Sequence, residues 1–165
     1  MLIKKKKMSA TIHYMFTQHF EVPAKTAYSW CTSFSAEDFS VINQENAERE
    51  IVPLTDEVLI LRDRYKTGQG WLLKEKLVHL YPDKLMWTST HLSGPNKHSQ
   101  FMYKIKAETK QTSYLVFTAN HIEDQKNLSG EDVCLLTEKC CSVDSDVWSR
   151  LAEALNKQNQ KKIRH

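Results

Sequence analysis

The chain has 165 residues, of which 41% are hydrophobic and 26% are charged, and its net charge is +3 at neutral pH. This size and composition are typical of one globular domain that builds a core without disulfides or metals. The four lysines at positions 4–7 supply more than the whole net charge, since 3 minus 4 leaves −1. The charge therefore gives no support to a nucleic-acid-binding face.

Several classes of site are excluded by what the sequence lacks. The four cysteines form no CxxC pair, and no histidine stands at a zinc-finger spacing from them. There is no phosphate-binding glycine loop, no catalytic Ser/His/Asp order and no secretory apolar core at the start. No apolar run approaches the roughly 18 residues that a membrane span needs. We therefore expect a cytoplasmic protein with no metal, no cofactor, no nucleic-acid partner and no stable membrane insertion.

The first third of the chain predicts one strand and two short helices. Residues 1–9 are expected to be a disordered basic tail, and residues 10–165 a single domain. Residues 11–22 alternate between apolar and polar side chains, which predicts a strand with one buried face. Proline at position 23 ends that strand and opens a helical pattern over 23–34. The cap signature Ser-Ala-Glu-Asp predicts a second short helix over 35–42.

Six strand patterns follow, separated by turn residues. They cover residues 47–54, 57–67, 71–81, 84–92, 99–109 and 113–122. Regular spacing of short strands joined by tight turns favours an antiparallel meander. The turn between the second and third of these strands is read as three residues, Gly68-Gln69-Gly70.

The last segment, residues 129–163, predicts one long helix. Ser129 is a cap candidate followed by acids, and cations stand at the other end. Apolar or small residues recur in steps of three or four, which places them on one helix face. They are Val133, Leu136, Cys140, Val143, Val147, Leu151 and Leu155. A helix of this length needs a large apolar surface, and the predicted sheet could supply it.

Charged side chains are expected to face water, and this assumption sorts the strands into two faces. Lys74 and Lys76, for example, are assigned to the outer face. The inner face then mixes apolar bulk with polar groups that are costly to bury without partners. Its candidate ligand-binding residues are Asp63, Tyr65, Trp71, Glu75, His79, Trp87, His91, Phe101 and Tyr103. Alternatively, the polar groups lie at strand ends or pair with one another, and the aromatic rings are simply core.

The order of elements resembles the helix-grip fold of the START/Bet v 1-like (SRPBCC) superfamily, including its polyketide cyclase/dehydrase and lipid-transport branches. The residues that carry the resemblance are Phe20-Glu21-Val22-Pro23-Ala24, Leu80-Tyr81-Pro82-Asp83-Lys84-Leu85, and the hairpin from Tyr103 to Leu115. The chain departs from the family pattern at Lys110-Gln111, where a glycine is usual. The resemblance implies an α+β fold in which a curved antiparallel sheet of about seven strands wraps a long C-terminal helix. It also implies two short helices after the first strand and a ligand cavity between sheet and helix.

Three functions fit these observations. The first is binding or carriage of a hydrophobic or amphipathic small molecule, such as a lipid, an isoprenoid quinone or a polyketide-like compound, without catalysis. The second is a cyclase/dehydratase-type enzyme, with Asp63, Glu75, His79 or His91 as acid and base, on family analogy alone. The third is a protein-interaction module whose interior is a closed core.

Overall fold

The structure is a computed structural model that describes residues 10–124 and 128–163. It confirms the predicted α+β fold and the predicted order of elements. The elements are β1 (Ala10–Phe20), α1 (Ala24–Cys31), α2 (Asp38–Val41), β2 (Ala47–Pro53), β3 (Val58–Thr67), β4 (Gly70–Tyr81), the 3-10 turn η1 (Pro82–Lys84), β5 (Met86–His91), β6 (Gln100–Ala107), β7 (Ser113–Glu123) and α3 (Gly130–Ile163). The expected basic tail, residues 1–9, lies outside the described residues.

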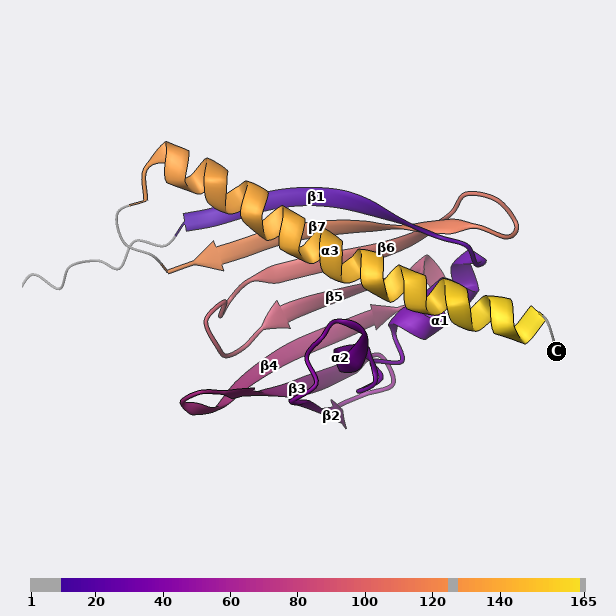
Figure 1. Ribbon diagram of the computed structural model, residues 1–165, viewed down its shortest axis with the longest axis horizontal. Coiled ribbons are helices and arrows are strands. Elements are labelled where there is room, and N and C mark those ends of the chain that lie inside the picture. The colour runs from indigo at the N-terminus through magenta and orange to yellow at the C-terminus, as the bar shows by residue number, and fades with distance from the viewer. Residues whose placement is uncertain (1–9, 125–127, 164–165) are drawn as a thin grey trace, which may run out of the picture.

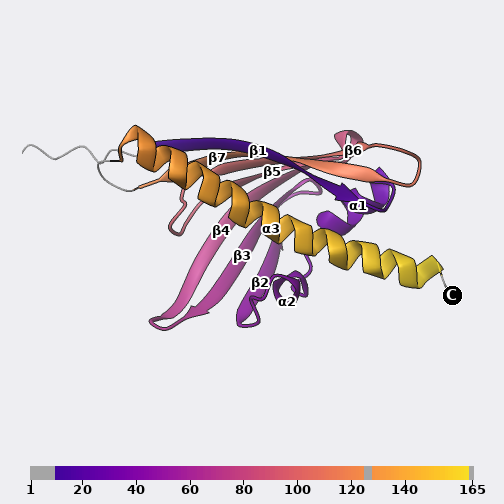
Figure 2. The same ribbon diagram turned by 45° about the horizontal axis from the view of Figure 1, so that its top comes forward.

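The seven strands form one antiparallel sheet in the order β1-β7-β6-β5-β4-β3-β2. The chain therefore runs as a meander from β2 to β7, and β1 joins the far edge. Helix α3 lies diagonally across one face of this sheet (Figure 1). The sheet is strongly curved, so that β2, β3 and β4 bend away from the line of α3 (Figure 2). A twisted sheet cannot follow a straight helix along its whole length, and the two layers separate on that side.

The closed core lies at one end of the molecule, where α1 and the C-terminal half of α3 come together over the sheet (Figure 1). Buried side chains at this end include Phe20, Val22, Ala27, Leu115, Ala152 and Leu155. Polar contacts fix the same end. The backbone N–H of Glu21 donates to Asn156 Oδ1 at 2.9 Å, and the Trp30 indole donates to Gln158 Oε1 at 3.0 Å. Helix α3 is thus anchored mainly through its second half.

The predicted start of α3 is confirmed by its capping contacts. The Ser129 hydroxyl accepts from the backbone N–H of Asp132 at 3.1 Å, and the Asp132 carboxylate accepts from the backbone N–H of Ser129 at 2.8 Å. This reciprocal pair satisfies two donors that a helix start leaves free. The Ser129 hydroxyl, which donates to the Asp132 carboxylate at 2.7 Å, and the Ser129 backbone N–H hold the pKa of Asp132 below its usual value.

The inward face predicted for β4 is wrong, because the pairing of β3 with β4 differs by one residue from the predicted one. Thr67 lies opposite Gly70, so the turn has two residues, Gly68 and Gln69, and Gly70 begins β4 with φ +120°. The same register places Lys74 opposite Asp63. Opposed residues share a face, and a shift of one residue exchanges the two faces of a strand. Lys74, Lys76 and Val78 therefore face inward, and Trp71, Leu73, Glu75, Leu77 and His79 face outward.

Some predicted boundaries also shift. The first short helix ends at Cys31, and Phe34 has φ +49°, a left-handed conformation that a helix cannot contain. Strand β5 begins at Met86, after η1 and Leu85, which has φ +48°. The inward faces predicted for β3, β5 and β6 agree with the structure, since Leu61, Trp87 and Phe101 are buried.

Candidate functional site

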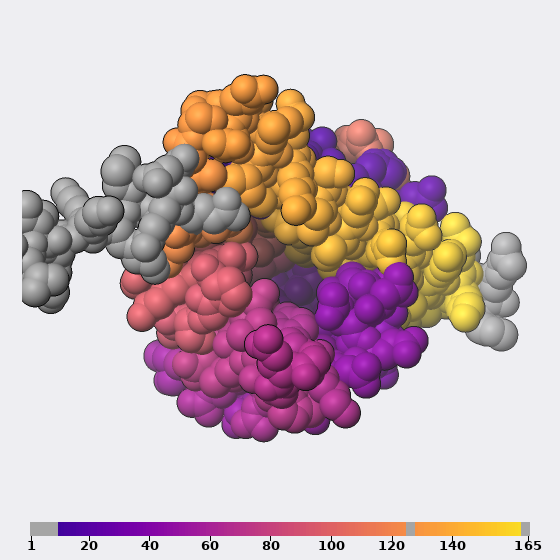
Figure 3. Space-filling model, turned by 60° about the vertical axis from the view of Figure 1, so that its left-hand side comes forward, coloured from indigo at the N-terminus to yellow at the C-terminus, as the bar shows by residue number. Residues whose placement is uncertain are grey.

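A cavity of about 790 Å³ opens where the sheet curves away from α3. Its walls are residues 136–151 of α3, the segment around α2, and the inner faces of β3 to β7. In the space-filling view the hollow lies between α3, the α2 segment and the strands of the middle of the chain (Figure 3). A volume of this size lies within the range of about 300–1,000 Å³ found for small-molecule sites.

The inner wall of the cavity is aromatic. The rings of Trp87 and Tyr103 stack with centroids 4.7 Å apart and an interplanar angle of 3°. Trp148 on α3 lies 5.7 Å from the Tyr103 ring and 6.3 Å from the Trp87 ring. Phe101 and Phe117 continue the same surface at a centroid distance of 5.8 Å. This wall offers flat apolar area with hydroxyl and indole groups at its edges.

Asp63 organises a charged cluster beside the cavity. Arg49 of β2 donates two hydrogen bonds to the Asp63 carboxylate, of 2.7 and 3.0 Å, and Lys76 Nζ donates to Oδ2 at 2.7 Å. Asp63 itself is fully buried. Burial alone would raise the pKa of Asp63, but the hydrogen bonds and charges of Arg49 and Lys76 outweigh it and hold that pKa below its usual value. The pair Arg49 and Asp38 adds a longer contact of 3.9 Å.

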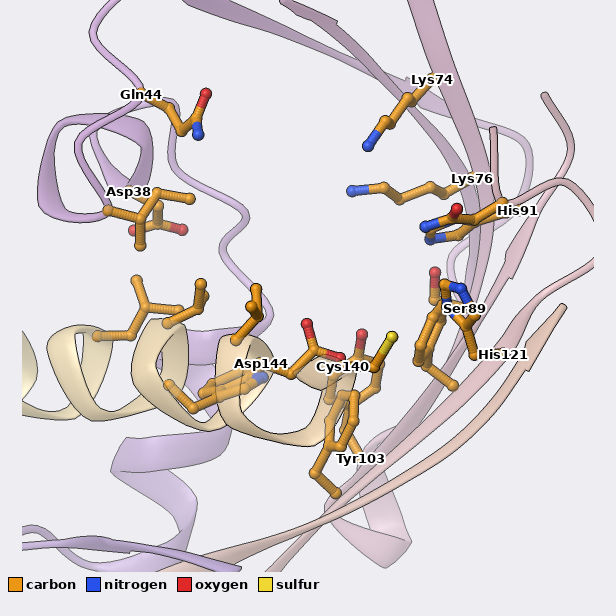
Figure 4. A pocket seen from close by; sticks show the side chains of 18 of the residues that line it. Asp38, Gln44, Lys74, Lys76, Ser89, His91, Tyr103, His121, Cys140 and Asp144 are labelled. Atoms are coloured by element: carbon orange, nitrogen blue, oxygen red, sulfur yellow. The ribbon is translucent and has the colours of Figure 1, made fainter. Parts of the chain in front are cut away.

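A second acid, Asp144, projects from α3 into the cavity (Figure 4). The Tyr14 hydroxyl of β1 donates to its Oδ2 at 2.5 Å. Burial raises the pKa of Asp144, against the opposing effects of the Tyr14 hydrogen bond and the positive charges of His121, Lys76 and Lys74. Burial likewise raises the pKa of Tyr14, and the hydrogen bond to Asp144 adds to this. The pair can hold a proton inside the cavity.

Two polar atoms of the sheet wall lack hydrogen-bond partners in the described part of the chain. Ser89 Oγ and His91 Nδ1 are both buried, and both residues line the cavity. Burial, together with the charges of Lys76 and Lys74, lowers the pKa of His91 to about 3, so its ring is neutral at pH 7. Buried polar atoms without a partner are rare in proteins.

The structure brings five of the nine candidate site residues to the cavity wall. These are Tyr65, Trp87, His91, Phe101 and Tyr103. Asp63 lies behind that wall, held by Arg49 and Lys76. That any of them contacts a ligand stays a prediction.

The other three candidates lie on the outer face, a direct consequence of the β4 register. Trp71 is 55% exposed, and Glu75 pairs with Arg62 at 3.1 Å. His79 is exposed and stacks on Tyr81 with centroids 4.7 Å apart. The proposed acid and base groups Glu75 and His79 therefore have no access to the cavity.

Sequence reasoning missed several polar groups of the cavity. They are Tyr14, Asp38, Arg49, Lys74, Lys76, His121 and Asp144. A usable signal existed for Asp144, which stands four residues after Cys140 and therefore on the same helix face. The lysines were missed because charged residues were assumed to face water.

Within the described residues, no group of three or more His, Cys, Asp or Glu side chains is arranged to hold a metal ion. No helix among them is long and apolar enough to cross a membrane.

No protein-family model matches the sequence, and no curated protein matches it. Solved structures do match the fold. The Zhui aromatase/cyclase from Streptomyces sp. R1128 has a TM-score of 0.62 and 14% identity over 87% of this chain and 94% of its own. Ara h 8.0201 has a TM-score of 0.63 and 9% identity over 88% of this chain and 98% of its own.

The di-domain ARO/CYC StfQ from the steffimycin biosynthetic pathway has a TM-score of 0.67 and 10% identity over 92% of this chain. This chain spans 52% of StfQ, about the length of one of its two domains. At these identities the likeness establishes the fold alone. The chain has the helix-grip fold that the resemblance implied.

Proposed function

We propose that this protein binds an amphipathic small molecule with an apolar, ring-containing or chain-like body in the cavity between α3 and the sheet. The observation that carries the proposal is a cavity of about 790 Å³ whose wall combines stacked aromatic rings with polar groups from several strands. Such a site buries an apolar body and orients it by a few directed polar contacts. Two fold neighbours are aromatase/cyclases, which is consistent with a cavity for polyketide-like compounds.

Binding without chemistry is the function that the arrangement supports best. Of the four acid and base groups inferred from the sequence, only His91 lines the cavity, and it is neutral at pH 7. Asp144, a further acid on the cavity wall, already accepts a hydrogen bond from the Tyr14 hydroxyl. The same apolar wall serves a lipid, a quinone or a polyketide-like compound, because all three present flat or extended hydrocarbon surface.

Native mass spectrometry of the purified protein, followed by solvent extraction, tests the proposal. We expect a complex with one small apolar or amphipathic molecule, which organic solvent releases and mass spectrometry identifies. After delipidation, the protein should take up N-phenyl-1-naphthylamine, a neutral fluorescent probe, in a saturable manner. An apo mass together with no saturable uptake of the probe would contradict the proposal.

A matched pair of variants locates the binding. Cys140 lies on α3 in the cavity wall, whereas Cys134 is exposed on the same helix. Cys140→Trp fills part of the cavity and should weaken probe binding by about tenfold or more, the loss expected when a few apolar contacts are blocked. Cys134→Trp should leave the affinity unchanged. Equal effects of the two substitutions would place the probe elsewhere.

A further inference from the structure

Lys74 projects into the cavity from β4 (Figure 4). Within residues 10–124 and 128–163, its ammonium makes no ion pair and no hydrogen bond, and lies over the Tyr65 ring at 5.2 Å from the centroid. The neighbouring cations differ, because Arg49 and Lys76 both bind Asp63. Burial and the charge of Lys76 lower the pKa of Lys74, and the charges of Asp63 and Asp144 oppose this shift without cancelling it.

The stem of Lys74 is held in place by the loop between β5 and β6. Gly94 has φ +87°, a conformation that favours glycine, and a Cβ at this position would lie 3.1 Å from Cγ of Lys74. The loop backbone therefore packs directly on the lysine stem. This contact restricts the side chain on the cavity wall, and the ammonium points into the hollow (Figure 4).

The charged groups around Lys74 already have partners of their own. Arg49 and Lys76 are paired with Asp63, and Asp144 on α3, whose charge also acts on Lys74, accepts a hydrogen bond from Tyr14. Among the described residues, Lys74 is therefore the cation of this group that has no direct ion-pair partner. Below it, on the same wall, lie the unpartnered atoms Ser89 Oγ and His91 Nδ1 (Figure 4). A neutral, purely apolar ligand would leave all three groups unsatisfied at a cost.

We infer that the ligand carries one singly charged oxyanion, of the carboxylate class, that binds the Lys74 ammonium while the apolar body lies against Trp87, Tyr103 and Trp148. This inference rests on the proposed function and adds the chemistry of the ligand's polar end. A single anionic group supplies the direct counter-ion that Lys74 lacks among the described residues. Its oxygen atoms also accept from the Ser89 hydroxyl, or from His91 in the tautomer that carries hydrogen on Nδ1.

Two fluorescent probes with the same aromatic body test this inference. N-phenyl-1-naphthylamine is neutral, and 8-anilino-1-naphthalenesulfonate adds one anionic oxyacid group. Lys74→Gln should weaken binding of the sulfonate probe by about tenfold, the value of one charge-assisted contact. It should change the affinity of the neutral probe by less than about twofold. Lys74→Arg should retain most of the affinity for the sulfonate probe.

Lys104→Gln is the matched control, because this lysine is exposed on β6 and does not line the cavity. It should leave the affinity of both probes unchanged. If Lys74→Gln and Lys104→Gln weaken the sulfonate probe equally, or if neither does, the inference is overturned while binding of the neutral probe still supports the proposed function. If wild-type protein binds neither probe, the proposed function itself fails.

Discussion

Asp63 is a fully buried carboxylate that compensates two partly buried cations, Arg49 and Lys76. We predict that Asp63→Asn lowers the free energy of unfolding by about 3–5 kcal/mol, because it leaves both cations without their counter-ion. Urea-induced unfolding measures the change. Glu75→Gln is the control, since it alters a more exposed pair with Arg62 on the opposite face of the same hairpin. It should cost less than about 1 kcal/mol.

The same residue predicts a pH dependence. The pKa of Asp63 is lower in the folded protein than its usual value of about 3.9, so its ionised form stabilises the fold. This contribution is complete above about pH 4, the region of the unfolded pKa, and is lost as the pH falls through the lower folded value. The stability difference between wild type and Asp63→Asn should therefore shrink with acidification below about pH 4. A constant difference from pH 7 to pH 2 would contradict the assignment.

At the scale of elements, α3 is anchored by one end and lines the cavity with the other. Leu155 is 3% exposed in the closed core, whereas Leu135 is 60% exposed. Leu155→Ala should lower the free energy of unfolding by about 2–5 kcal/mol, as expected for a truncated core leucine. Leu135→Ala should stay within about 0.5 kcal/mol of wild type. Similar losses in the two variants, measured by urea unfolding, would mean that α3 does not pack as described.

The elements were predictable from sequence because each has its own local signal. Alternation defined β1, the cap at Ser129 defined the start of α3, and turn residues separated the strands. The faces of β4 were not predictable, because they depend on whether Gly70 belongs to the turn or to the strand. Because Gly70 belongs to the strand, Lys74 faces the cavity and Glu75 faces outward, the reverse of the prediction.

The assumption that charged side chains face water gave the wrong faces for β4 for a second physical reason. Lysines were assigned to water, but Lys76 faces inward because Asp63, across the hairpin, supplies its counter-ion. Arg49 could not be placed from local pattern either, since its partner lies 14 residues away on another strand. Contacts of this kind depend on strand register, which local periodicity does not contain. The aromatic residues of β5 and β6 were assigned to the correct face, because no charged side chain points inward on those strands and their apolar residues alternate regularly.

At the scale of the whole molecule, the curvature of the sheet against a straight helix produces the cavity. The fold is shared with proteins of 9–14% identity, so it depends on the order of elements and on their apolar faces more than on particular residues. Individual polar side chains, Lys74 and Asp144 among them, face the hollow. Specificity for a ligand would therefore reside in them.

The location of a bound molecule tests the central claim most directly, and the four tryptophans provide the reporters. Trp87 and Trp148 line the cavity, whereas Trp71 lies on the outer face and Trp30 packs beside Gln158. The measurement is a titration with N-phenyl-1-naphthylamine, followed through the four indole N–H signals in ¹⁵N NMR spectra and assigned with Trp→Phe variants. We predict saturable shifts of the Trp87 and Trp148 signals and constant positions for Trp71 and Trp30. Saturable shifts confined to Trp71 or Trp30, or no saturable shift at all, would show that the cavity is not the binding site.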